Sequence, residues 1–413
     1  MRLGVLLFMD RTVFVAPFFR GNTRRFLEGF LELEDTAVAV IGMEDEGAVP
    51  ADLRARMSTY VRVGDAGNSD QLVEALRVIR SSVGAPESLN GFLEQLQEPL
   101  AVARAVMGLP GMDPATARRF RDKDAMKSCL RSAGVAVARS ALCSSLDAAR
   151  RFVDDVGWPV IVKPLDGAGA KATFRATSDD SLSEALGSFG RGAGPVQVEE
   201  FVRGREHTCE TVFVDGKAVW RSGTHYIPGP LAVLENPWMQ YAVVLPREAD
   251  DPEFADFHTV SDVALTALGL RTGLAHMEWF RTEDGRSLVN EVGARPPGAN
   301  IVPLMSLAHD ADLWGMWARL MVKRTFEPPT RKWAAGTCFF RGRGHGSVVA
   351  VHGLAEAQEE VGRYVVDARL PRVGQAKSSG YEGEGWAIVK AATTAEVVHA
   401  LGRLVQTVRV ELA

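Results

Sequence analysis

The apolar positions follow two different patterns along the chain, and the change between them divides it. In the first third, residues 3–8 and 37–41 are apolar runs without alternation, as is typical of buried strands in a parallel sheet. A helix is expected over residues 24–33, and further helices near residues 70–81 and 89–106. We therefore expect an α/β domain. No GxGxxG follows the first strand, so no dinucleotide site is predicted there.

From about residue 114 the pattern becomes rich in strands. Residues 115–133 predict a helix, with Asp113 and Pro114 as its cap and first-turn residue. Two hairpins are expected, one through residues 212–219 that turns at Asp215-Gly216 and one over residues 273–293 that turns at Asp284-Gly285. The remaining predicted elements are strands at 160–163, 174–176 and 197–200 and an amphipathic helix at 253–268.

The last part of the chain follows a Pro-rich polar segment, residues 325–332, which predicts a linker. Beyond it, residues 336–341 and 347–352 suggest a hairpin, and residues 395–405 a helix. We expect a small α+β region here.

Composition narrows the class of protein. A chain of 413 residues is expected to form two or three domains. A formal net charge of −5 without a basic tract gives no electrostatic footprint for nucleic acid. We expect neither a signal peptide nor a membrane span. The four cysteines lie far apart without a CxxC, which favours reduced cysteines and a cytoplasmic protein.

The second hairpin carries the most informative pattern. If Asp284-Gly285 is a two-residue turn, Glu278 lies opposite Glu291, His276 opposite Gly293, and Phe280 opposite Val289, all on one face. Two opposed carboxylates repel each other unless a cation lies between them, and oxygen ligands on strands suit Mg²⁺ that also takes phosphate oxygens. The alternative is a pair of solvated glutamates on an open sheet face.

Arg295 follows this hairpin in the sequence ARPPGANI. Its guanidinium is suited to binding a phosphate or carboxylate through two hydrogen bonds, and the Pro-Pro-Gly beside it predicts a rigid loop. An ordinary surface turn is the alternative.

Weaker signals precede the hairpin. Lys163 ends the apolar strand VIVK, where an ammonium group needs an anion. Gly167 and Gly169 follow in DGAGAKAT, a loop whose backbone N–H groups could close over phosphates, although it lacks the Walker A spacing. Lys123 opens a predicted helix, and residues 199–206, EEFVRGRE, end a strand whose exposed backbone could meet an adenine edge. Each of these features taken alone also fits a plain turn, a solvated lysine or a charged strand end.

These motifs occur in one order along the chain, and that order resembles the ATP-grasp superfamily over about residues 114–321. Lys123 in RDK looks like the family's first ATP-binding lysine. Lys163 in WPVIVKP looks like the second, and the flexible glycine lid, residues 165–174 with Gly167 and Gly169, follows it.

The resemblance also implies roles for later residues. EEFVRGRE is similar to the family's adenine hinge, so Glu199 is expected to receive the adenine amino group, Val202 the ring nitrogen through its backbone, and Glu206 the ribose. HMEWF and NEVGARPPG resemble the metal-binding strands, with Glu278 and Glu291 as ligands of Mg²⁺ or Mn²⁺.

One departure concerns the metal. The family usually reads Glu-x-Asn-x-Arg, whereas Gly293 stands here at the Asn position. Asn290 precedes Glu291, and its side chain should face away if the strand is regular. The sequence ARPPG is similar to the branch that joins amino acids into dipeptides and related amides. In that branch the arginine, here Arg295, meets a substrate carboxylate, and a residue like His276 borders the pocket.

The resemblance implies a mixed α/β and α+β protein with the ATP-grasp fold. We expect a Rossmann-like pre-ATP-grasp domain at 1–113, the ATP-grasp core at 114–325 and a small C-terminal α+β domain at 326–413. The implied function is an ATP-dependent carboxylate–amine ligase that forms an acyl phosphate and releases ADP and phosphate. Arg295, Lys163 and His276 are its expected catalytic residues.

Two other classes stay open at this stage. One is a biotin-carboxylase-type or other acyl-phosphate enzyme on the same fold, and the other is a non-catalytic ATP-binding protein. The expected partners are a small carboxylate and an amine, with amino acids favoured, and a homodimer is possible. Neither nucleic acid nor membrane is expected as a partner.

Overall fold

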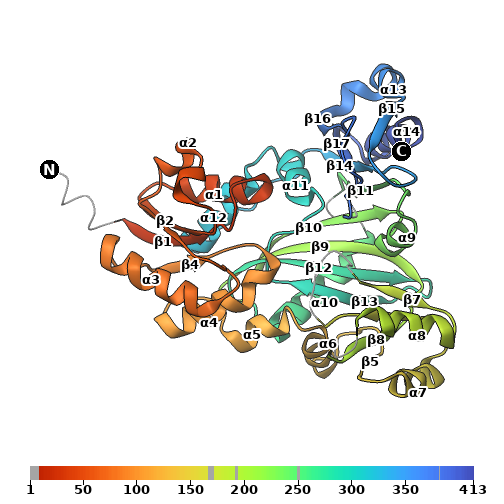
Figure 1. Ribbon diagram of the computed structural model, residues 1–413, viewed down its shortest axis with the longest axis horizontal. Coiled ribbons are helices and arrows are strands. Elements are labelled where there is room, and N and C mark those ends of the chain that lie inside the picture. The colour runs from red at the N-terminus through yellow and green to blue at the C-terminus, as the bar shows by residue number, and fades with distance from the viewer. Residues whose placement is uncertain (1–8, 166–171, 191–193, 249–251, 381) are drawn as a thin grey trace.

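The computed structural model describes residues 9–165, 172–190, 194–248, 252–380 and 382–413. The N-terminal region lies at one end of the molecule, beside a large sheet that runs through the centre (Figure 1). A smaller sheet with two helices lies against the other end of the large sheet, and the C-terminal region extends that large sheet. In the described ranges no helix has both the length and the apolarity needed to cross a membrane.

The N-terminal sheet is parallel and covered on both faces, which confirms the α/β prediction. Alternate residues of its central strand face opposite sides, so Phe14 packs towards α1 whereas Val13 and Val15 pack towards α3 and α4. The strand order is β3-β2-β1-β4. The elements are β1 (Asp10–Val15), α1 (Gly21–Leu31), β2 (Thr36–Gly42), η2 (Glu46–Ala48), α2 (Ala51–Arg54), β3 (Thr59–Arg62), α3 (Ser69–Val83), β4 (Ser88–Asn90), η3 (Glu94–Leu96) and α4 (Gln97–Met107).

Two predictions for the N-terminal region need comment. The strand expected at residues 3–8 lies outside the described residues. The single helix expected over 89–106 is wrong, because its first residues form β4, paired with β1, and α4 begins only at Gln97. Pro99 explains this start, since a proline is tolerated in the first turn of a helix but not in its interior.

The single helix expected over 115–133 is also wrong. Two helices, α5 (Pro114–Arg119) and α6 (Lys123–Ser132), meet at a break. Asp113 caps the first one, as predicted, and Asp122 accepts hydrogen bonds from two backbone N–H groups at the start of the second. A second capping carboxylate inside the segment therefore restarts the helix, and Lys123 becomes the first residue of α6.

The smaller sheet is antiparallel with the order β5-β8-β6-β7. Val160, Val162, Val196 and Val198 face α7 and α8 and form a separate core beneath the sheet. The opposite face of the smaller sheet is turned towards the large sheet. The elements are β5 (Ser140–Cys143), α7 (Leu146–Val156), β6 (Val160–Lys163), β7 (Phe174–Ala176), α8 (Asp179–Ser188) and β8 (Val196–Glu200).

The large sheet has eight strands in the order β13-β12-β9-β10-β11-β14-β17-β16. The predicted turn at Asp215-Gly216 is confirmed, and both residues have positive φ, as a tight hairpin turn requires. On one face Trp279 stacks on Phe257 of α10 with ring centroids 3.9 Å apart. The elements between residues 204 and 323 are β9 (Gly204–Val214), β10 (Lys217–Ile227), α9 (Pro230–Glu235), β11 (Tyr241–Leu245), α10 (Pro252–Leu268), β12 (Gly273–Thr282), β13 (Ser287–Gly293), α11 (Ile301–His309) and α12 (Leu313–Lys323).

The C-terminal region adds strands to this sheet. The hairpin expected from residues 336–341 and 347–352 is wrong, because β14 (Ala334–Phe340) pairs with β11 and β17, whereas β15 (Val348–His352) pairs with β18 (Arg409–Leu412). The sheet thus continues across residue 325, and the three-domain division stays a prediction. The other elements are α13 (Leu354–Val361), η4 (Gly362–Tyr364), β16 (Val365–Arg369), β17 (Gly385–Ala391) and α14 (Thr394–Thr407).

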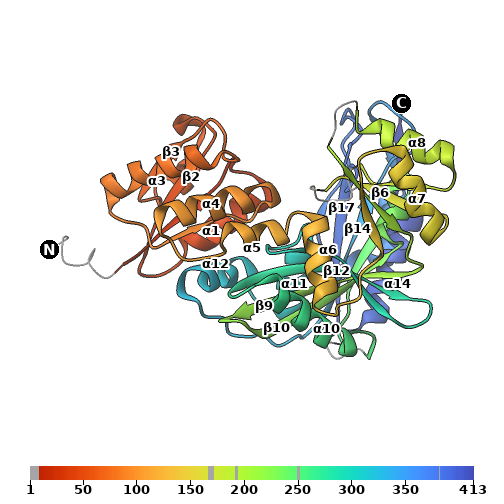
Figure 2. The same ribbon diagram turned by 90° about the horizontal axis from the view of Figure 1, so that it is seen from below.

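The N-terminal region and α12 share one core. Phe26 and Phe30 of α1 make edge-on ring contacts with Trp317 of α12, at centroid distances of 5.0 and 5.5 Å. The view from below places α12 directly against the N-terminal region (Figure 2). The N-terminal region is therefore anchored by a helix that follows the large hairpin in sequence.

Candidate active site

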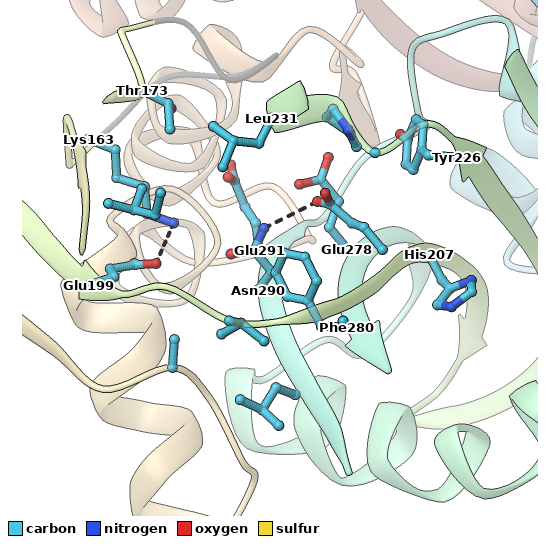
Figure 3. Close-up of a pocket in the computed structure, with 18 of the residues that line it drawn as sticks. Lys163, Thr173, Glu199, His207, Tyr226, Leu231, Glu278, Phe280, Asn290 and Glu291 are labelled. Atoms are coloured by element: carbon cyan, nitrogen blue, oxygen red, sulfur yellow. Dashed lines mark hydrogen bonds and ion pairs between the residues drawn. The ribbon is translucent and has the colours of Figure 1, made fainter. Parts of the chain in front are cut away.

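A cavity of about 770 Å³ lies between the smaller sheet and the β12–β13 hairpin of the large sheet. Figure 3 shows Lys163 and Glu199 at one side of it and Glu278, Asn290 and Glu291 near its centre. The cavity is lined from β6, β8, β9, β10, α9 and both hairpin strands, and Lys123 and Arg295 also line it. The structure thus brings together the predicted side chains that lie within the described residues.

The opposed carboxylates are found where the sequence predicts them. Glu278 pairs directly with Glu291, and His276 with Gly293. The predicted pairing of Phe280 with Val289 is wrong, because the register shifts after Glu278 and Phe280 pairs with Leu288. The cause is a three-residue loop, residues 283–285, in place of a two-residue turn, and a bulge restores the register of the glutamates.

The bulge changes the position of Asn290. A regular strand would turn its side chain away, but Asn290 lines the cavity, and its Nδ2 donates to Glu206 Oε1 at 3.5 Å. The expectation that Asn290 faces away held only for a regular strand, and the bulge means that this condition is not met. An amide now stands beside the carboxylate pair, although the position that the family motif gives to asparagine is Gly293.

His276 is held in its charged form. Its Nδ1 lies 2.8 Å from Glu210 Oε1, and its Nε2 lies 3.7 Å from Glu278 Oε1. Burial opposes the charge, but the hydrogen bonds and charges of Glu210 and Glu278 outweigh it and raise the pKa of His276 to about 9. No sequence pattern marks Glu210, a fully buried carboxylate that also accepts a hydrogen bond from Thr208 Oγ1.

The pKa values of two cavity carboxylates shift in opposite directions. Burial would raise the pKa of Glu278, but His276, Lys163 and Arg295 together lower it. Burial and the nearby charge of Glu278 instead raise the pKa of Glu206, the expected ribose ligand, to about 8. Glu278 is therefore a charged candidate metal ligand, while Glu206 is suited to hydrogen bonding with hydroxyl groups.

The predicted lysines lie at the cavity and meet carboxylates. Lys163 Nζ lies 3.0 Å from Glu199 Oε2, and Lys123 Nζ lies 3.3 Å from Glu291 Oε1. Although burial opposes the charge, Glu199 and Glu291 raise the pKa of Lys163. Sequence reasoning missed Lys127, whose Nζ lies 2.5 Å from Glu199 Oε1. Its spacing of four residues from Lys123 on one helix was the available signal.

Arg295 lines the cavity and joins it to the N-terminal region through Glu94. Its Nε pairs with Glu94, and its Nη1 donates to the backbone oxygen of Pro296 at 2.9 Å. Glu94 also accepts from Arg121 Nη1 at 2.7 Å. Burial would raise the pKa of Glu94, but the two arginines lower it. No local pattern marks Glu94, because its partner Arg295 follows about two hundred residues later.

Three further expectations concern the nucleotide. Val202 lines the cavity at the predicted hinge. Gly167 and Gly169 lie outside the described residues, as does most of the predicted lid. Within the lid's described ends, the Leu165 carbonyl accepts from the Lys123 backbone N–H at 3.1 Å, and Thr173 lines the cavity.

The donor set fits a hard divalent cation that completes its shell with phosphate. Glu278 and Glu291 supply two opposed carboxylates, and the Asn290 amide lies beside them. Among the described residues, no group of three or more His, Cys, Asp or Glu side chains is placed to hold a metal by itself. Phosphate oxygens would therefore have to complete the coordination.

Comparison with known proteins supplies an independent finding. Residues 128–304 match the ATP-grasp domain family. Over 227 residues the chain is 27% identical to the L-arginine-specific L-amino acid ligase of Bacillus subtilis, and the match covers 54% of each protein. Over 272 residues it is 22% identical to a D-alanine–D-alanine ligase of Oceanobacillus iheyensis, covering 64% of this chain and 71% of that protein.

The fold extends the likeness to the whole chain. The crystal structure of an L-amino acid ligase from Bacillus licheniformis superposes with a TM-score of 0.77, at 17% identity, over 98% of this chain and 99% of that one. In sequence, the chain spans about half the length of the Bacillus subtilis relative. The fold predicted from the order of the motifs is confirmed.

Proposed function

Because this chain carries an ATP-grasp domain, we propose that it is an ATP-dependent ligase that joins a carboxylate to an amine. The β12–β13 hairpin carries this proposal. It presents Glu278 opposite Glu291, with His276 on the same face and Arg295 directly after it. An anion receptor thus stands beside a candidate metal site, as an acyl-phosphate route requires. The names of the relatives support amino acids as the acid and the amine.

In the proposed reaction the substrate carboxylate attacks the γ-phosphorus of ATP in line, and ADP leaves. The amine then attacks the acyl phosphate, the bond to phosphate breaks, and the amine loses a proton. Lys123 and Lys163 both line the cavity and offset the charge of the phosphates. Glu278 and Glu291 would hold Mg²⁺, which neutralises charge on the phosphate oxygens when bound.

Arg295 and His276 are assigned to the acid. Among the described residues, Glu94 and Pro296 take Nε and Nη1 of Arg295, which leaves Nη2 for a substrate carboxylate. His276 lies between the carboxylates of Glu210 and Glu278, and its imidazole is placed to stabilise negative charge on the acid. The predicted lid, residues 165–174, would keep water from the acyl phosphate.

The test is a screen of acid–amine pairs for release of ADP and phosphate. We expect turnover that requires both substrates, or is much faster with both. Hydroxylamine should trap the activated acid as a hydroxamate when the amine is left out. Glu278→Gln should abolish trapping, whereas Glu283→Gln, an exposed glutamate in the loop of the same hairpin, is the matched control and should keep it.

Two results would replace this proposal. A bicarbonate-dependent ATPase that ignores amines would establish a carboxylase-type reaction. Tight ATP binding without turnover for any pair would establish a non-catalytic ATP-binding protein.

A further inference from the structure

One buried carboxylate lies between two buried ammonium groups at the edge of the cavity. Glu199 of β8 meets Lys163 of β6 at 3.0 Å and Lys127 of α6 at 2.5 Å, each through a different carboxylate oxygen. The three residues are 3%, 6% and 0% exposed. Three separate elements therefore bring two positive charges to one negative charge in a place with little water.

The two lysines differ in what they face. Lys163 and Glu199 line the cavity, and Figure 3 shows their ion pair at its side. Lys127 is absent from the part of the cavity wall that the structure describes, because it lies behind Glu199. A ligand in the cavity can therefore touch Lys163 directly, whereas Lys127 acts on it only through Glu199.

Lys127 changes the net charge of the Lys163–Glu199 pair. With Lys163 alone, Glu199 would form a neutral pair, and a phosphate would have to take the ammonium group from that carboxylate. Breaking a buried ion pair leaves an uncompensated charge and is strongly unfavourable. With Lys127 present, Glu199 keeps one partner when the other turns to a ligand. Burial lowers the pKa of Lys127 to about 8, which still leaves it charged at neutral pH, so the group has a net charge of +1 and Lys163 is its positive member on the cavity side.

We propose that Lys127 is a positioning residue that holds the Glu199 carboxylate and so releases Lys163 to the phosphates of ATP. The inference rests on the proposed binding of ATP in this cavity. It assigns to Lys127 a role that requires no contact with the nucleotide.

The test compares the binding of ATP and of adenosine by calorimetry. Adenosine has no phosphates, so Lys127→Met should leave its affinity within about threefold. ATP affinity should fall at least about tenfold, the scale of one lost charged hydrogen bond. Arg131→Met removes a positive charge from an exposed position of the same helix and should change neither affinity.

Rescue separates this role from a merely structural one. In Lys127→Met/Glu199→Gln the neutral amide no longer binds Lys163 as a counter-ion. The ratio of ATP affinity to adenosine affinity, which cancels any change in the contact of residue 199 with adenine, should therefore return to within about threefold of the wild type. Lys127→Arg, which keeps the charge, should also retain it. A purely structural Lys127 would give no rescue by Glu199→Gln.

Each outcome decides one question. If the wild-type protein binds no ATP, the proposed function fails. If it binds ATP, and folded Lys127→Met binds ATP equally well or the double variant is not rescued, the inference on Lys127 is overturned. Should Lys127→Met not fold, Glu199→Gln alone decides the matter. The ratio of its ATP affinity to its adenosine affinity should be at least that of the wild type, and a lower ratio would overturn the proposal.

Discussion

Glu94 offers the sharpest test of how the N-terminal region is joined to the active site. It binds Arg121 at 2.7 Å and pairs with Arg295. The three side chains are between 11% and 16% exposed. Glu94→Ala would leave two mostly buried guanidinium groups without their shared carboxylate.

The expected magnitude follows from this burial. Removing one partner of a fully buried ion pair costs roughly 3–5 kcal/mol, and the remaining exposure of these side chains lowers that to about 3 kcal/mol. Urea denaturation followed by tryptophan fluorescence measures the loss of stability. Adding Arg121→Met to Glu94→Ala should recover part of it, because one of the two unpaired charges is then gone.

Glu46 provides a matched control. Like Glu94 it begins a short 3-10 helix and binds an arginine, Arg54, at 2.8 Å, but its side chain is 62% exposed. Glu46→Ala should therefore cost less than about 1 kcal/mol. Equal losses for Glu94→Ala and Glu46→Ala would refute the reasoning that burial makes the Glu94 group important.

Four further predictions concern the site and stability. Glu278→Gln and Glu291→Gln should each lower turnover at least about a hundredfold while the circular dichroism spectrum stays unchanged, and full activity with Mg²⁺ in both would end the metal assignment. Lys163→Ala should weaken ATP binding at least about tenfold by calorimetry, and an unchanged affinity would make it a structural lysine. Arg295→Ala should raise the KM for the substrate acid and leave that for ATP nearly unchanged, and the reverse pattern would contradict its assignment. Burial, aided by the charge of Arg331, lowers the pKa of His309 from 6.5 to about 4, so the unfolded chain binds a proton there that the folded chain does not. The contribution of neutral His309 to the free energy of unfolding is therefore fully present above pH 6.5 and falls by about 3 kcal/mol as the pH drops to 4. His309→Leu should reduce the slope of the free energy of unfolding against pH, measured in acid titrations, by nearly one proton.

The sequence predicted the parts of the site that depend on local spacing. The pairing of Glu278 with Glu291 was predicted from a two-residue turn, and it holds although the loop has three residues, because the bulge offsets the extra residue. Lys163 could be placed because a charged residue ended an apolar strand. Each of these features could be predicted from residues that lie close together in the sequence.

The parts that could not be predicted depend on distant contacts or small irregularities. One extra residue in the hairpin loop and a compensating bulge bring Asn290 into the cavity, and no residue pattern marks that bulge. Glu94 and Glu210 belong to the site only through their contacts with Arg295 and His276, which lie on other elements. Lys127 was missed, because its spacing from Lys123 places both on one helix but does not show that β6 and β8 cover it.

The core shared by α1 and α12 has a consequence during synthesis of the protein. Phe26 and Phe30 leave the ribosome early, but their partner Trp317 follows almost three hundred residues later. At about 5–20 residues per second, that interval is roughly a quarter of a minute to a minute. During this time the side of α1 that Trp317 later covers is exposed to water, and Phe14 and Phe92 are the ring partners that the N-terminal region itself offers to Phe30 and Phe26.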